Sequence, residues 1–154
     1  MDFNSMGRAI ASAEGVVMPV RHPNGLPLYA AQDRKTKAWT LTTEASIDGH
    51  DVHPCTLRVV SKDTRAFRRR GHEIADEMRK LKDVKAEQAE VEAMRLVMSA
   101  VTGWSNIIWA EDGQDPEPLA FSDANLRQFF SGYRAAMEQV DTFCADRANF
   151  LPGA

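Results

Sequence analysis

The sequence predicts an α+β fold: a small N-terminal antiparallel β region of three to four short strands, followed by a C-terminal bundle of three to four helices. Two observations carry this prediction. Residues 1–62 alternate Pro- and Gly-containing turns with short segments rich in Thr, Val and aromatic residues, as strands are. Residues 64–101 contain no proline and a single glycine, and are dense in good helix formers. We therefore divide the chain into a β-rich region, residues 1–62, and a helical region, residues 63–154, and expect one compact unit.

The size and net charge of the chain limit the classes of protein to which it can belong. At 154 residues it fits one domain and can bury a core without a disulfide or a metal. A net charge of −3 gives no general attraction to nucleic acid or to an anionic membrane. No apolar run reaches the roughly 18–20 residues of a membrane span, and the N-terminus lacks the apolar stretch of a secretory signal. We expect a cytoplasmic chain with two reduced cysteines and no cofactor.

The first element is a short helix within residues 2–14, where apolar residues recur at three- and four-residue steps. Asn4 or Ser5 is the expected N-cap, because their side chains accept a hydrogen bond from an unpaired amide of the first turn. Gly15 ends the segment.

Short strands and turns follow. Segments 16–20 and 28–31 flank the turn HPNGLP, in which Asn24-Gly25 accepts positive φ at little cost. Residues 36–47, TKAWTLTTEASI, alternate weakly and favour a further strand. After a turn at Asp48-Gly49, the segment CTLRVV (residues 55–60) is predicted to be the last strand.

The charged region 64–101 contains two apolar stripes with a weak middle. Residues at helical spacing make the first stripe: Ile74, Met78 and Leu81. Those of the second are Val91, Met94, Val97, Met98 and Val101. Between the stripes only Val84 and alanines offer apolar surface. We favour two helices that break near Asp83, with Asp83 as the cap of the second; the alternative is one long helix with an exposed centre.

The clearest helix start in the chain is Ser122, as an N-cap. Phe121 and Leu126 then occupy the two positions of a hydrophobic staple around it. The apolar spacing that follows is nearly continuous and is interrupted by Gly132, which bends or divides the helix. Residues 149–154 are predicted to be a frayed tail.

Residues 102–126 join the two helical parts and hold two of the three tryptophans. Seven apolar residues in and around this joint are the candidate partner-binding residues: Met94, Met98, Trp104, Trp109, Phe129, Phe130 and Met137. Methionine adapts to varied apolar surfaces, and tryptophan is enriched at binding hot spots. The alternative for each of them is an ordinary place in the core.

One cluster has the residue types of a metal site: Asp48, His50, Asp51, His53 and Cys55. A zinc site needs about four converging ligands, commonly in paired spacings. This cluster has one cysteine and no second group to complete a tetrahedron. We therefore expect a polar hairpin loop here and no bound metal.

No catalytic motif is recognisable. Gly71-His72-Glu73-Ile74 begins like the zinc-protease motif H-E-x-x-H, but Asp76 stands where the second histidine is required. The chain has no G-x-S-x-G, P-loop or G-x-G-x-x-G motif. The sequence therefore predicts a protein that is not an enzyme.

The strongest basic cluster is Arg65–Arg70, with arginine at four of its six positions. Such charge could contact phosphates, and Phe67 could stack on a base. Acidic residues follow within two turns, and pairs such as Arg69–Glu73 would offset the charge. We therefore favour a mixed-charge helix face over a nucleic-acid site.

Three segments carry a family resemblance. Residues 14–28, EGVVMPVRHPNGLPL, have a strand followed by a His-Pro turn, and residues 61–70, SKDTRAFRRR, have an acidic and small pair before an aromatic, basic helix start. Residues 101–130 place a Trp after a small residue, then an acidic-Gly turn, Pro-Leu, an aromatic, Ser, and a helix opening with Asn-Leu. In this order, over about a third of the chain, they resemble the tail assembly chaperones of long-tailed, siphovirus-like bacteriophages and prophages.

The resemblance implies a non-enzymatic assembly factor of the host cytoplasm that is absent from the finished virion. Such proteins bind the tape measure protein, keep it soluble and help recruit tail tube subunits. The resemblance also implies, as further partners, a longer frameshifted form of the chain or other copies of it. Two alternatives stay open: a structural tail completion or connector protein, and a nucleic-acid-binding regulator that uses Arg65–Arg70.

Overall fold

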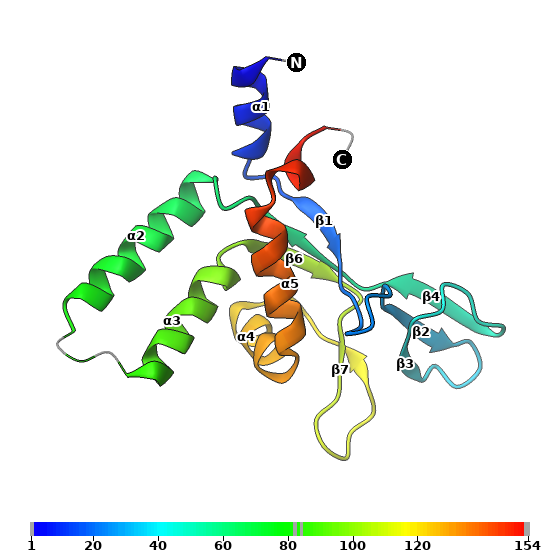
Figure 1. Ribbon diagram of the computed structural model, residues 1–154. Helices are drawn as coiled ribbons and strands as arrows, with labels where there is room; N and C mark the ends of the chain where they lie inside the picture. Colours follow the sequence, from blue (N-terminus) through cyan, green and yellow to red (C-terminus); the bar gives the residue numbers. More distant parts are fainter. Residues whose placement is uncertain (1, 82, 84, 153–154) are drawn as a thin grey trace.

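A computed structural model describes residues 2–81, 83 and 85–152 and confirms the α+β fold (Figure 1). The elements in chain order are α1 (Phe3–Ile10), β1 (Val16–Pro19), β2 (Tyr29–Asp33), β3 (Trp39–Thr42), β4 (His50–Pro54), β5 (Thr56–Val59), α2 (Arg65–Arg79), α3 (Ala86–Met98), β6 (Val101–Ser105), β7 (Ile108–Trp109), β8 (Glu117–Pro118), α4 (Asp123–Gly132), α5 (Arg134–Ala145) and the 3₁₀ helix η1 (Arg147–Phe150). None of the described helices is long and apolar enough to cross a bilayer.

The strands form three antiparallel sheets, in the orders β1-β5-β6, β3-β2-β4 and β7-β8. The first two are joined through Cys55, the single residue between β4 and β5. Its amide donates to the Leu28 carbonyl at 3.0 Å, and its carbonyl accepts from the Val20 amide at 2.9 Å. The extended segment 50–59 therefore runs from one sheet into the other, and the arm made by β2, β3 and β4 projects from the body of the molecule (Figure 1).

The N-terminal helix forms, but the predicted cap is wrong. Asp2 is the N-cap, and its carboxylate accepts from the Ser5 amide at 2.7 Å. The helix ends at Ile10, before Gly15. Gly15 has φ +72°, and a Cβ there would lie 2.8 Å from the Val59 carbonyl oxygen. A glycine is therefore required where the chain turns into β1.

The charged region forms two helices, so the predicted break near Asp83 is confirmed. The predicted cap at Asp83 is wrong: Lys85 is the N-cap of α3 and makes no side-chain capping bond. Val84 lies outside the described residues. At the other end of this hairpin of helices, the Thr64 hydroxyl caps α2 by accepting from the Phe67 amide at 3.4 Å.

One hydrophobic core draws side chains from both predicted regions. Its largest fully buried side chains include Leu57 from β5, and Leu126, Phe130 and Val140 from α4 and α5. β6, which follows the charged helices, pairs with β5 and places Trp104 opposite Leu57. Residues 101–126 therefore do more than join helices: they supply the strands β6, β7 and β8, none of which was predicted as a strand from the sequence.

The predicted start of α4 is confirmed, since the Ser122 hydroxyl accepts from the Asn125 amide at 3.1 Å. Leu126 is buried, whereas Phe121 stays 37% exposed and meets the edge of the Trp104 ring, with centroids 5.2 Å apart. Gly132 ends α4 and α5 begins two residues later, which confirms that the helix divides at this point.

The predicted frayed tail is wrong for its first residues. Residues 147–150 form η1, which buries Phe150 against the edge of the Phe143 ring, with centroids 5.6 Å apart. The apolar contact of Phe150 outweighs the cost of ordering the chain end. Residues 153–154 lie outside the described part of the chain.

An ion pair between Arg147 and Asp63 links η1 to the start of α2, with Nε–Oδ2 at 2.6 Å and Nη2–Oδ1 at 3.2 Å. The hydrogen bonds from Arg147 hold the pKa of Asp63 below its ordinary value. A carboxyl with a lowered folded-state pKa adds stability above its unfolded pKa of about 3.9, and this stability is lost as the pH falls through the folded value.

We therefore expect Arg147→Ala to lower the melting temperature at pH 7, and the difference from the wild type to shrink as the pH falls below about 4. Thermal melts followed by circular dichroism across this range measure it. A difference that stays constant with pH would contradict the assigned role of the pair.

Candidate partner-binding site

A pocket of about 640 Å³ opens between the β1–β2 turn, β3, β7 and α4, and we name it the apolar pocket. Its lining is mostly hydrocarbon, chiefly from Leu28, Leu41, Ile107, Ile108, Trp109 and Phe129. His22, Thr42, Thr43 and Tyr133 supply the polar groups around them. Pockets of this size and composition bind apolar groups, with a few polar groups that orient them.

Aromatic packing around Phe129 holds one wall of the apolar pocket. The Trp104 and Trp109 rings both meet Phe129 nearly at right angles, with centroids 5.6 Å and 6.3 Å away. The Trp104 indole also donates to the Leu119 carbonyl at 2.8 Å, so its polar atom is satisfied. Edge-to-face pairs of this kind are preferred arrangements, and they fix where the Trp109 ring lies.

A second wall is the β1–β2 turn, which α5 holds through Arg21. The Gln139 side chain accepts from the Arg21 amide and donates to its carbonyl, both at 2.9 Å, as a neighbouring strand would. The Tyr133 hydroxyl donates to the same carbonyl at 2.5 Å. Burial raises the pKa of Tyr133, so the hydroxyl keeps the proton that it donates.

Cys55 lines the apolar pocket but does not offer a reactive thiolate. Burial raises its pKa to about 12, and that of Cys144 to about 11. Both thiols are therefore neutral near pH 7, because desolvation disfavours the charged form. Cys55 acts as a small apolar surface, and the pocket as described is suited to bind apolar side chains.

The structure separates the seven candidate residues into three groups. Trp109 and Phe129 line the apolar pocket, and Trp104 packs against Phe129. Phe130 is fully buried and offers no surface to a partner in this conformation. The methionines are half-buried and pack against the core from α3 and α5: Met94, Met98 and Met137. Their role as partner contacts stays a prediction.

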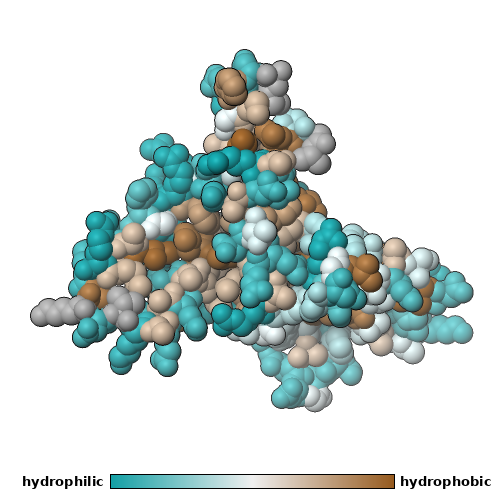
Figure 2. All heavy atoms as spheres, viewed as in Figure 1, coloured by the Kyte–Doolittle hydropathy of each residue, from teal (hydrophilic) through white to brown (hydrophobic). Residues whose placement is uncertain are grey.

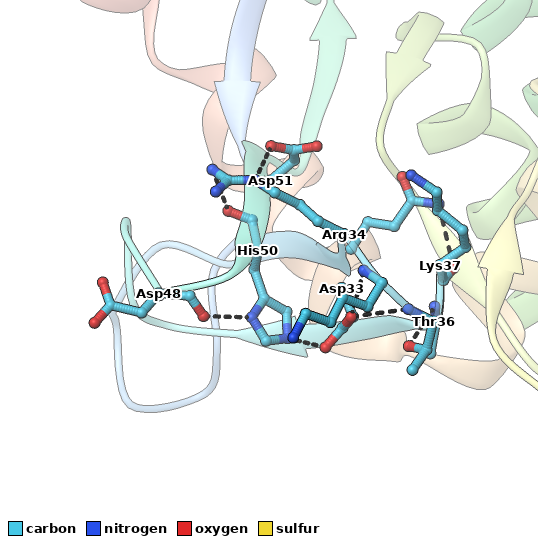
Figure 3. Close-up of polar contacts among 10 residues, drawn as sticks. Asp33, Arg34, Thr36, Lys37, Asp48, His50 and Asp51 are labelled. Carbon is cyan, nitrogen blue, oxygen red and sulfur yellow. Dashed lines mark hydrogen bonds and ion pairs between the residues drawn. The ribbon is translucent and has the colours of Figure 1, made fainter.

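All of the candidate metal cluster except Cys55 lies on the β2–β3–β4 arm, where His50 and Asp51 have protein partners (Figure 3). Asp51 pairs with Arg34 at 3.0 Å, and His50 contacts the Asp48 carbonyl through Nδ1 at 3.0 Å. The other ring nitrogen of His50 lies 3.7 Å from Asp33. The described residues contain no group of three or more potential ligands placed to hold a metal.

The predicted polar loop is wrong for residues 50–54, which form β4 and pair with β2 from Asp33↔His50 to Tyr29↔Pro54. Pro54 is tolerated because β4 is an edge strand of its sheet, where an amide donor can be missing without breaking the ladder. The Asp48 carboxylate points away from His50 and Asp51 (Figure 3).

Leu41, Ile107 and Tyr133 line the apolar pocket but were not predicted as site residues from the sequence. Leu41 carried the only available signal, as the one aliphatic side chain between threonines in β3, 51% exposed. In the sequence, Tyr133 was indistinguishable from the other residues of an apolar helix stripe.

Comparisons of the chain with protein-family models, with curated proteins and with solved structures give no match.

Proposed function

We propose that this protein is a non-enzymatic tail assembly chaperone of a long-tailed bacteriophage or prophage. It binds the tape measure protein in the host cytoplasm, keeps it soluble, helps recruit tail tube subunits and is absent from the finished virion. The resemblance of residues 14–28, 61–70 and 101–130 supports this proposal. The structural observation that supports it best is the apolar pocket, because residues 101–130 supply Ile107, Trp109 and Phe129 to its lining.

The apolar pocket suits a helical partner with an apolar stripe. Such a helix inserts side chains at i, i+3 and i+4 into a hydrophobic groove, and burial contributes about 25 cal/mol for each Å² of apolar surface. A charged side chain inserted here would lose its hydration and find few polar partners. Apolar stripes of a long helical protein, which aggregate when exposed, are therefore the segments that this surface would cover.

Leu41→Asp is the variant that tests the pocket as the binding site. Leu41 is half-exposed at the rim, so an aspartate there is solvated in the free protein but meets apolar surface in the complex. We expect at least a tenfold loss of affinity, about 1.4 kcal/mol. The measurement is the soluble fraction of the tape measure protein on co-expression, followed by the affinity of the purified pair.

Leu26→Asp is the matched control. Leu26 is 50% exposed on the β1–β2 turn and does not line the apolar pocket, so the same substitution should leave binding unchanged. Equal losses of affinity in both variants would show that the apolar pocket is not the binding site. If the wild-type pair does not associate, the chaperone function itself is overturned.

Mass spectrometry of purified particles tests the structural alternative, since a tail completion or connector protein must be present in them.

A further inference from the structure

Three arginines form an exposed basic face at the start of α2. Arg65, Arg68 and Arg69 are all exposed, and we name them the arginine face. Their spacing of three and four residues places them on one side of the helix. With Ala11, Asp63 and His72 they line a hollow of about 530 Å³.

No direct ion pair within the described chain neutralises the arginine face; the nearby Asp63 carboxylate attracts Arg68 only at longer range. The predicted pair of Arg69 with Glu73 is wrong, because Glu73 pairs with Arg70 at 3.0 Å. Asp63, the one carboxylate in the hollow, is bound by Arg147. Among the described residues, Arg65, Arg68 and Arg69 have no ion-pair partner.

This arrangement is unfavourable for α2 itself. Like charges three and four residues apart repel, and the first turn of α2 contains no acidic residue to offset them. Local features that oppose stability are expected at functional surfaces. A partner with negative charge would relieve the repulsion.

The same chain carries such a partner on the β7–β8 hairpin, in the loop and at the first residue of β8. Asp112, Asp115 and Glu117 are exposed and make no side-chain hydrogen bond or ion pair with any other described residue; we name them the acidic hairpin. Their neighbour Glu111 is already engaged by Gln128 and Trp109. In Figure 1 this loop projects from the end of the molecule opposite the start of α2, and Figure 2 shows its surface as hydrophilic.

We propose that the acidic hairpin of one copy docks into the hollow beside the arginine face of a second copy. Three acidic side chains meet three arginines, and a projecting loop meets a concave surface. Because the two surfaces differ and lie at opposite ends, the contact is head-to-tail and extends into a chain or closes into a ring. The inference does not depend on the proposed function, since it requires no other protein.

Sedimentation velocity over a range of protein concentrations tests this contact. In low salt the average mass should rise above the 17.2 kDa of the monomer as the concentration increases. In about 0.5 M NaCl it should return to the monomer, because salt screens exposed charge pairs. A chain that stays monomeric in low salt at every concentration would overturn the proposal.

Charge reversal identifies the surfaces. Arg68→Glu/Arg69→Glu and Asp112→Lys/Asp115→Lys should each be monomeric alone, and an equimolar mixture should associate again, because each supplies what the other lacks. The control Arg127→Glu/Arg134→Glu makes the same change in net charge on exposed residues of α4 and α5, and should still associate.

Two results would count against the proposed contact. If the control loses association as fully as the first variant, net charge and not the arginine face is responsible. If the wild type is monomeric and binds double-stranded DNA in a salt-dependent way that Arg68→Glu/Arg69→Glu abolishes, the arginine face binds phosphates and not a second copy. Circular dichroism of each variant verifies that it is folded.

Discussion

Gly132→Ala is expected to lower the free energy of unfolding by about 2 kcal/mol, although alanine is the better helix former. A Cβ at position 132 would lie 2.1 Å from Cη2 and 2.7 Å from Cζ2 of Trp109. Phe129 packs against the Trp109 ring, so moving the ring disturbs the wall of the apolar pocket. Overpacking costs about 1–3 kcal/mol, whereas the gain in helix propensity is at most about 1 kcal/mol and is smaller at a helix end. The steric cost should therefore exceed the gain.

Thermal unfolding measures this effect, at roughly 2–4 °C for each kcal/mol in a chain of this length. Gly103→Ala is the control, because a Cβ at that position in β6 would meet no atom within 4 Å. Trp109→Phe in the Gly132→Ala background should recover part of the loss, since the smaller ring vacates the space that the methyl group needs. Equal melting temperatures for the two alanine variants would show that Trp109 moves aside without cost.

Where one residue determines the start or end of a helix, the sequence predicted that boundary in two cases. Ser122 was identified as a helix start because a hydroxyl before an apolar helix satisfies an unpaired amide, and the structure has that bond. Gly132 was identified as a divider, but the sequence could not show why: its partner Trp109 is far away along the chain. The cap of α1 was missed because Asp2 and Ser5 are equally suited by type, and the fold of the first turn decides between them.

Contacts between distant segments could not be predicted in this way. β6 is a strand because it pairs with β5, and the register Leu57↔Trp104 joins residues from the two halves of the chain. The apolar pocket collects side chains from five segments of the chain, so Leu41 and Tyr133 had no shared pattern in the sequence. The burial of Phe130 could not be predicted either, because it depends on the whole core. The helical spacing of Phe130 in the sequence is equally consistent with a partner-binding surface and with the protein interior.

Phe130→Ala is expected to produce the largest loss of stability among single substitutions in α4, about 3–5 kcal/mol. The Phe130 side chain has 0% of its surface exposed and is the largest fully buried side chain of the described chain. Truncation removes its apolar contacts and leaves a cavity that well-packed neighbours fill only in part. Chemical denaturation should show the loss as a lower midpoint with an unchanged slope.

Phe3→Ala is the matched control, because the same substitution on α1 removes a side chain that is 92% exposed and should change stability by less than about 0.5 kcal/mol. If Phe130→Ala does not fold, Phe130→Leu keeps most of the apolar volume and should fold with a smaller loss. Equal stability of the two alanine variants would place Phe130 at the surface, as the partner-binding prediction requires. A large difference instead assigns Phe130 to the core, and any loss of binding in Phe130→Ala then reports unfolding rather than a lost contact.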